Sequence, residues 1–130
     1  EAPMPELPEV ETVVRDLRPL LAGRAITGTR VSKHKLRRPW KPAWSAGVVG
    51  ARVDAVRRRG KWILIDLEQR GAKPRGSLLR VHLGMTGQFT VVPAETPEPD
   101  HVHVVFALDN GTELRLRDSR RFGSAELFPD

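Results

Sequence analysis

Short apolar runs separated by turn residues fill most of this chain and constrain its fold more than any other feature. Only the first part has helical periodicity, because its apolar residues recur at steps of three and four. They are Leu7, Val10, Val14, Leu17 and Leu21. We expect strands at 26–33, 52–59, 62–67, 77–83, 88–92, 101–108, 112–117 and 125–128. One helix followed by many short strands predicts a β-sandwich or barrel that carries a helix.

Glycine and proline mark the ends of these elements, and Asp109-Asn110-Gly111 between 101–108 and 112–117 is a strong hairpin signal. Pro8 suits the first turn of a helix, and Gly23 is a natural C-terminal stop. Pro19 conflicts with an unbroken helix, so we expect the last turn to bend or to end early. The acidic, Pro-rich segment 93–100 is expected to be a mobile loop.

Composition limits the chemistry of the chain. Its 130 residues suffice for one domain, and the absence of Cys excludes disulfides, a thiolate nucleophile and a Cys-ligated zinc within them. No apolar run approaches the roughly 20 residues of a membrane helix, and the start lacks a secretory h-region, so we expect a soluble cytoplasmic protein. The net charge of +6 favours nucleic acid as partner, although Arg-rich chains also come from high-GC genomes.

The opening Met4-Pro5-Glu6 offers a nucleophile. An initiator Met before a small residue such as Pro is usually trimmed, which leaves a free secondary amine. Because an α-amino group has a pKa near 8, such an amine can attack an electrophilic carbon and form an iminium. Glu6 can donate or shuttle a proton. The alternative is that Pro5 and Glu6 simply begin a helix.

Two further segments suggest contact with a nucleic acid. The run from Arg57 to Lys61 holds four cations in five residues and suits phosphate, or else forms a solvated strand edge. Met85, in the turn Gly84-Met85-Thr86-Gly87, suits a wedge that enters a base stack. The alternative for Met85 is a side chain that folds back onto the sheet.

The segment Asp118-Ser119-Arg120-Arg121-Phe122-Gly123 places two Arg beside an aromatic ring. These side chains can pair with phosphates and push into a duplex, although Phe122 can equally be a core aromatic. Upstream, His101 and His103 alternate on one strand face, a spacing that suits a metal. No further ligand is evident, so a phosphate contact by one His is the favoured interpretation and no metal is expected.

Taken together, these segments resemble the formamidopyrimidine-DNA glycosylases, bacterial repair enzymes for oxidised purines. Any one segment is weak, but the set occurs in the order of the family and spreads across the chain. The matching segments are Pro5-Glu6-Leu7-Pro8-Glu9-Val10-Glu11-Thr12, Arg58-Arg59-Gly60-Lys61, His82-Leu83-Gly84-Met85-Thr86-Gly87, His101-Val102-His103-Val104 and Asp118-Ser119-Arg120-Arg121-Phe122-Gly123.

The resemblance implies a mainly β fold, a two-layer antiparallel β-sandwich with flanking helices. Residues 1–4 would be an extension with the initiator Met, and 5–130 the N-terminal catalytic domain. The helix–two-turn–helix module and the Cys-ligated zinc finger of the family would be absent from this chain. No cofactor is therefore expected here, and the one structural zinc of the family would belong to the missing part.

The resemblance also implies an activity and its residues. Pro5 would attack C1′ of the damaged nucleotide, and Glu6 would be the acid that assists opening of the sugar ring or departure of the base. Lys61 would bind a phosphate and assist proton transfer. The enzyme would excise 8-oxoguanine and formamidopyrimidines through a Schiff base, then cut the strand by β,δ-elimination.

The resemblance also implies which residues contact DNA. His101, Arg120 and Arg121 would hold the DNA backbone, and Met85, Arg120 and Phe122 would fill the gap left by the extruded lesion. The partner would be double-stranded DNA with an oxidised purine or an abasic site, met by a monomer in the bacterial cytoplasm at the nucleoid. Without the second half, we expect weak binding and very low turnover.

Two other functions stay open at this stage. The first is a non-catalytic DNA-binding module with the same fold, because Pro5 cannot be the nucleophile if residues 1–4 keep it in a peptide bond. The second is a basic β-domain that binds RNA or protein.

Overall fold

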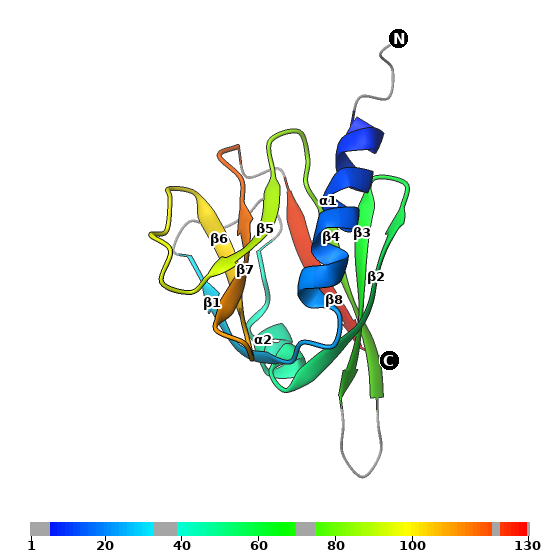
Figure 1. Cartoon of the computed structure of the whole chain (residues 1–130), viewed down its shortest axis with the longest axis vertical. Coiled ribbons are helices and arrows are strands. Elements are labelled where there is room, and N and C mark those ends of the chain that lie inside the picture. Colours follow the sequence, from blue (N-terminus) through cyan, green and yellow to red (C-terminus); the bar gives the residue numbers. More distant parts are fainter. Residues whose placement is uncertain (1–5, 33–38, 70–74, 121–122, 130) are drawn as a thin grey trace.

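The computed structural model describes residues 6–32, 39–69, 75–120 and 123–129, with the side chains of 6–8 and 129 outside the description. Two four-stranded antiparallel sheets form its two layers (Figure 1). The elements in chain order are α1 (Glu6–Leu21), β1 (Ile26–Val31), α2 (Pro42–Val48), β2 (Ala51–Arg59), β3 (Trp62–Gln69), β4 (Arg75–His82), β5 (Gln88–Pro93), β6 (Val102–Leu108), β7 (Thr112–Arg117) and β8 (Ser124–Pro129). The predicted two-layer sandwich with flanking helices is confirmed.

The order of strands is β1-β6-β7-β5 in one sheet and β2-β3-β4-β8 in the other. The pairs β2–β3 and β6–β7 are neighbours in sequence and in space. In the second pair, Gly111 has φ +81°, a conformation that glycine adopts without steric cost, as the Asp109-Asn110-Gly111 signal predicts.

Three connections cross from one sheet to the other, and the first of them, between β1 and β2, contains α2. The turn Gly84–Gly87 leads from β4 to β5, and residues 118–123 lead from β7 to β8, so in each case the flanking strands belong to different sheets. A Cβ on Gly87 would lie 2.3 Å from the carbonyl oxygen of Leu83. Only glycine therefore permits the tight turn after β4.

Helix α1 packs the apolar stripe that the sequence shows against the second sheet, mainly β2. The four described members of the stripe are 0–5% exposed. The helix continues through Pro19 to Leu21, with the amide of Ala22 donating to Arg18 O at 3.0 Å. The expected early end is wrong, because Leu21 is fully buried and its packing holds the last turn in place.

The acidic loop between β5 and β6 is fastened to the sheet, whereas the sequence predicted a mobile loop. Arg115 is only 5% exposed and donates to the carbonyl oxygens of Ala94, Thr96 and Pro97 at 2.8–3.5 Å. Arg117 Nε donates to Asp100 O at 2.8 Å. These bonds fix the end of the loop directly before His101.

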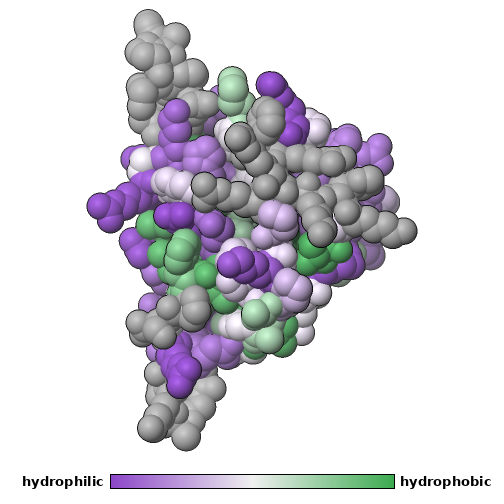
Figure 2. Space-filling model, turned by 180° about the vertical axis from the view of Figure 1, so that it is seen from behind, coloured by the Kyte–Doolittle hydropathy of each residue, from purple (hydrophilic) through white to green (hydrophobic). Residues whose placement is uncertain are grey.

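The surface of the sandwich is mixed in polarity. Seen from behind (Figure 2), hydrophobic residues gather in separate patches among hydrophilic ones. Within the described ranges, neither helix is long and apolar enough to cross a membrane.

Candidate nucleic-acid interface

Four segments that are far apart in sequence meet at one end of the sandwich. They are the first turn of α1, the β2–β3 turn, the β4–β5 turn and the β7–β8 connection, all at the top of Figure 1. Each contains a residue that the sequence analysis selected. The fold therefore brings the predicted functional segments to one edge.

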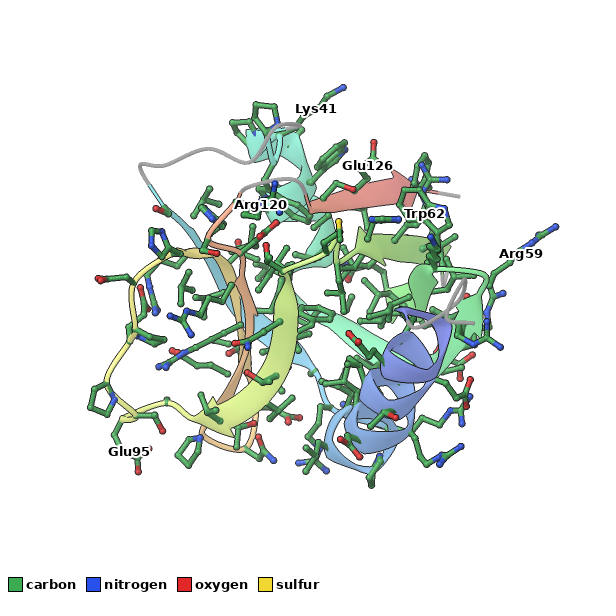
Figure 3. The ribbon with its side chains drawn as sticks, turned by 90° about the horizontal axis from the view of Figure 1, so that it is seen from above. Lys41, Arg59, Trp62, Glu95, Arg120 and Glu126 are labelled. Carbon is green, nitrogen blue, oxygen red and sulfur yellow. The ribbon has the colours of Figure 1, made fainter. Side chains whose placement is uncertain are left out.

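The β2–β3 turn separates its cations into two groups. Arg57 Nε lies 2.7 Å from Asp66 Oδ2, and Arg58 Nε lies 2.8 Å from Glu11 Oε1 in α1. The hydrogen bond that Arg58 donates lowers the pKa of Glu11, and the hydrogen bonds that Arg57 donates to Asp66 raise the pKa of Arg57. Arg59 instead projects outward (Figure 3), so the four cations are not equivalent as candidates for phosphate contact.

Lys61 is exposed and is predicted to bind phosphate. The next residue is Trp62, whose ring packs against two neighbouring side chains. The guanidinium of Arg80 lies 4.0 Å from the centre of the Trp62 ring, and Glu126 fixes that guanidinium at 3.1 Å. The ring of His82 makes an edge contact with Trp62 at 4.9 Å. These contacts connect the β2–β3 turn to the end of β4, where the next turn begins.

Met85 stands at the tip of the β4–β5 turn and is 73% exposed. The turn is closed beneath it, because Gly84 N donates to His82 Nδ1 at 3.0 Å and Gly87 N to Leu83 O at 2.8 Å. The alternative in which Met85 folds back onto the sheet is wrong. Its thioether is available to a ligand at this edge.

Asp118 connects this turn to the β7–β8 segment. Its side chain is fully buried, Oδ1 accepts from the Thr86 hydroxyl and from Arg120 N (3.1 Å), and Oδ2 accepts from Gly123 N (2.7 Å). Burial alone would raise the pKa of Asp118, but these hydrogen bonds and the nearby His103 outweigh it and lower the pKa. Asp118 has no role of its own among the predictions from the sequence. The bond to the amide two residues later is typical of an Asx turn, which is a local signal for it.

The two histidines do not share an exposed face, so that expectation is wrong. His101 precedes β6, is exposed and has φ +69°, whereas His103 is 2% exposed. A register shift between Val102 and Val104 breaks the alternation of faces that the sequence suggested. His103 Nε2 lies 2.7 Å from Asp118 O, inside the protein.

Metal binding finds no support in the described residues. None of them form a group of three or more His, Asp or Glu that could hold a metal ion.

The structure places Lys61, Met85, His101 and Arg120 at this edge. The hydrogen bond from Asp118 N to His101 O (3.0 Å) adds His101 to the same group of contacts, and Arg120, two residues after Asp118, is exposed. Pro5, Arg121 and Phe122, together with the side chain of Glu6, lie outside the described residues. Their roles stay predictions.

Comparison with known proteins shows the family. Residues 4–125 match the family model described as "Formamidopyrimidine-DNA glycosylase N-terminal domain". The chain belongs to this family.

Relatives and solved structures agree with the assignment. The formamidopyrimidine-DNA glycosylase of Stenotrophomonas maltophilia is 47% identical over 121 residues, 93% of this chain and 42% of the relative. That of Aromatoleum aromaticum is 48% identical over 122 residues, 92% of this chain and 41% of the relative. The chain therefore spans less than half the length of these relatives.

Two structures of the Lactococcus lactis enzyme match the fold, each with a TM-score of 0.80 and 26% identity over 95% of this chain. One is a complex with DNA containing FAPY-dG, and the other a complex with DNA containing an abasic site. The chain covers 44% and 43% of those proteins, respectively.

Proposed function

We propose that this chain is the N-terminal part of a base-excision repair enzyme that removes oxidised purines from DNA and then cleaves at the abasic site. The membership of the family supports the glycosylase class, and the DNA complexes of the structural neighbours support the substrate. One structural observation carries the proposal. Lys61, Met85, His101 and Arg120, which are distant in sequence, lie at one end of the sandwich, where α1 also begins directly after Pro5.

The reaction begins at the amine of Pro5, once residues 1–4 have been removed. The nitrogen attacks C1′ of the nucleotide, the bond between C1′ and the base breaks, and the base leaves with the proton that the attacking amine loses. Glu6 supplies a proton to the sugar oxygen as the ring opens, which leaves an iminium between Pro5 and C1′. The iminium acidifies the C2′ proton, so loss of that proton expels the 3′ phosphate and a second elimination expels the 5′ phosphate.

The remaining residues hold the DNA in the required shape. A glycosylase must extrude its base from the stack, and a side chain that fills the gap lowers the cost of unstacking. We assign entry into that gap to Met85 and Arg120, which are both exposed, and to Phe122, which follows Arg120 by two residues. Lys61 and His101 contact phosphates, and Arg121 assists them.

The proposed setting is a bacterial cytoplasm, where the enzyme acts as a monomer on double-stranded DNA. Phosphate contacts dominate affinity for DNA, and the chain spans less than half the length of its relatives. We therefore expect this chain alone to bind weakly, with strong dependence on salt.

Trapping with borohydride tests the proposal. We expect a chain that starts at Pro5 to form a covalent adduct with abasic-site duplex, detected by mass, because borohydride reduces the iminium to a stable amine. A matched chain that keeps residues 1–4 should form none, since its Pro5 nitrogen is an amide. If the chain that starts at Pro5 binds abasic duplex but gives no adduct, the function is the non-catalytic DNA-binding module.

A further inference from the structure

The side chain of Asp118 joins two of the connections that cross between the sheets, β4–β5 and β7–β8. Thr86, which follows Met85 in the β4–β5 turn, donates its hydroxyl to Oδ1. In the β7–β8 connection, the amides of Arg120 and Gly123 donate to Oδ1 and Oδ2 at 3.1 and 2.7 Å. One carboxylate therefore fastens the turn that carries Met85 to the segment that carries Arg120.

The backbone of Asp118 extends this junction to β6. Its amide donates to His101 O at 3.0 Å, and its carbonyl oxygen lies 2.7 Å from His103 Nε2. Asp118 is thus bonded to His101 through its backbone, and to the connections that carry Met85 and Arg120 through its side chain.

Burying a carboxylate is costly unless hydrogen bonds compensate. In Asp118 the compensating donors come almost entirely from the two exposed connections rather than from the strands of the core. An apolar residue of similar size would fill the space equally well but would leave the amides of Arg120 and Gly123 without this acceptor. The charge therefore has a geometric role as well as a stabilising one.

We propose that Asp118 is a positioning residue that holds Met85 and Arg120 in one fixed arrangement, so that both enter the base stack together. The inference rests on the proposed function and deepens it. Side chains that are already in place lose less freedom when they enter DNA, so the arrangement favours distorted DNA over regular duplex.

Hydrogen exchange tests the fastening itself. In Asp118→Asn, one oxygen becomes an NH₂ donor, so at least one of the two connections loses its acceptor in either orientation of the amide. We expect the amide that faces the new NH₂, that of Arg120 or of Gly123, to exchange at least tenfold faster, with the amides of β3 unchanged. Glu113→Gln is the matched control, because Glu113 is a buried carboxylate (7% exposed) that pairs with Arg115 away from this edge.

Binding to DNA tests whether the hydrogen bonds of Asp118 favour distorted DNA over regular duplex. The quantity is the ratio of Kd for undamaged duplex to Kd for a duplex with a tetrahydrofuran abasic analogue, measured at low salt. We expect Asp118→Asn to lower this ratio about tenfold while Kd for undamaged duplex stays within about twofold. Glu113→Gln should keep the wild-type ratio even if its Tm falls, so a general loss of stability cannot produce the expected result.

Variants of Thr86 test the bond between Asp118 and the β4–β5 turn separately from its bonds within the β7–β8 connection. Thr86→Val removes the hydroxyl donor and should speed exchange at Gly87 but not at Gly123, with part of the ratio lost, and Thr86→Ser should restore both. Wild-type exchange or a wild-type ratio in Asp118→Asn overturns the inference alone. A wild-type chain that does not prefer the abasic duplex overturns the proposed function and this role with it.

Discussion

Met85 keeps 73% of its surface in water although its side chain is apolar. Entry into a base stack would remove that surface from solvent, which is favourable. We expect Met85→Ala to weaken binding to abasic-site duplex about tenfold, or about 1.4 kcal/mol. Its free energy of unfolding should change by less than about 0.5 kcal/mol, since no core contact is lost.

Fluorescence anisotropy with labelled duplexes and urea unfolding measure the two effects. Val49→Ala is the control, because Val49 is also an exposed apolar residue (42%) but follows α2. An equal loss of affinity for undamaged and abasic duplex in Met85→Ala would assign Met85 a general contact instead of a wedge.

The carboxylate of Asp118 makes the stability of the chain depend on pH. Its pKa is lowered in the folded protein, so the ionised group stabilises the fold above the ordinary Asp pKa of about 3.9. As the pH falls through and below that value, the unfolded chain binds the proton first and the contribution is lost. We expect the difference in Tm between wild type and Asp118→Asn to be constant from pH 7 to pH 5.

Below about pH 4 the same difference should narrow, because wild-type Asp118 also becomes neutral. Calorimetry at pH 7, 5 and 3 checks this. The comparison uses differences, so titration of the other carboxylates largely cancels. A difference in Tm that is as large at pH 3 as at pH 7 would show that the charge of Asp118 contributes nothing.

At the scale of elements, the loop between β5 and β6 depends on one buried cation. Arg115 pairs with Glu113 at 3.0 Å and donates to three carbonyl oxygens of the loop. Removing one partner of a buried pair leaves the other uncompensated and costs roughly 3–5 kcal/mol. We expect Arg115→Met to lower the free energy of unfolding by about 3 kcal/mol and to expose residues 94–100 to proteases.

Arg30→Ala provides the contrast for this prediction. Arg30 also pairs with Glu113, at 3.4 Å, but its side chain is 55% exposed. An exposed pair contributes about 1 kcal/mol or less. Urea unfolding of both variants, with limited proteolysis, checks the difference, and similar losses in the two would contradict the role given to burial.

The elements that the sequence predicts well are those with local causes. The β6–β7 hairpin follows from Asp109-Asn110-Gly111, and the α1 stripe from its own periodicity. The turn Gly84–Gly87 shows the limit. Its residues predict a tight turn, but whether β4 and β5 pair with each other depends on which distant strands compete for them, and β8 and β7 take those places.

In the site, too, features with local causes can be predicted from the sequence, whereas partners that are distant in sequence cannot. Exposure of Met85 is consistent with its place in a Gly-flanked turn. By contrast, Arg58 pairs with Glu11, which is 47 residues away, and Thr86 bonds to Asp118, which is 32 residues away. Such partners are set by the packing of sheets and helix, so a list of basic residues cannot show which ones stay available for DNA.

At the scale of the whole molecule, the net charge of +6 is a poor guide to affinity, because many cations are paired internally. Each phosphate contact releases counterions and adds roughly 0.9 to the slope of log Kd against log salt. The slope of log Kd against log salt therefore reports how many phosphates the protein contacts, whereas the net charge reports only the excess of cationic over anionic residues.

Two arginines of β2, Arg57 and Arg59, test whether the salt slope depends on phosphate contacts rather than on net charge. Arg59 projects outward at the predicted DNA-binding edge, whereas Arg57 on the same strand makes two hydrogen bonds to Asp66, at 2.7 and 3.0 Å. Both variants, Arg59→Ala and Arg57→Ala, change the net charge by the same amount. We expect Arg59→Ala to lower the salt slope by about 0.9 and Arg57→Ala to leave it nearly unchanged.

Titrations of undamaged duplex between 20 and 200 mM salt measure both slopes on the same protein preparation. Because both substitutions remove one charge, equal decreases would mean that long-range attraction governs binding and that the geometry of this edge is irrelevant to it. A decrease confined to Arg59→Ala would place a DNA phosphate beside the β2–β3 turn. It would also explain why this basic chain uses two of its clustered cations, Arg57 and Arg58, to hold strands and helix together while a third faces the ligand.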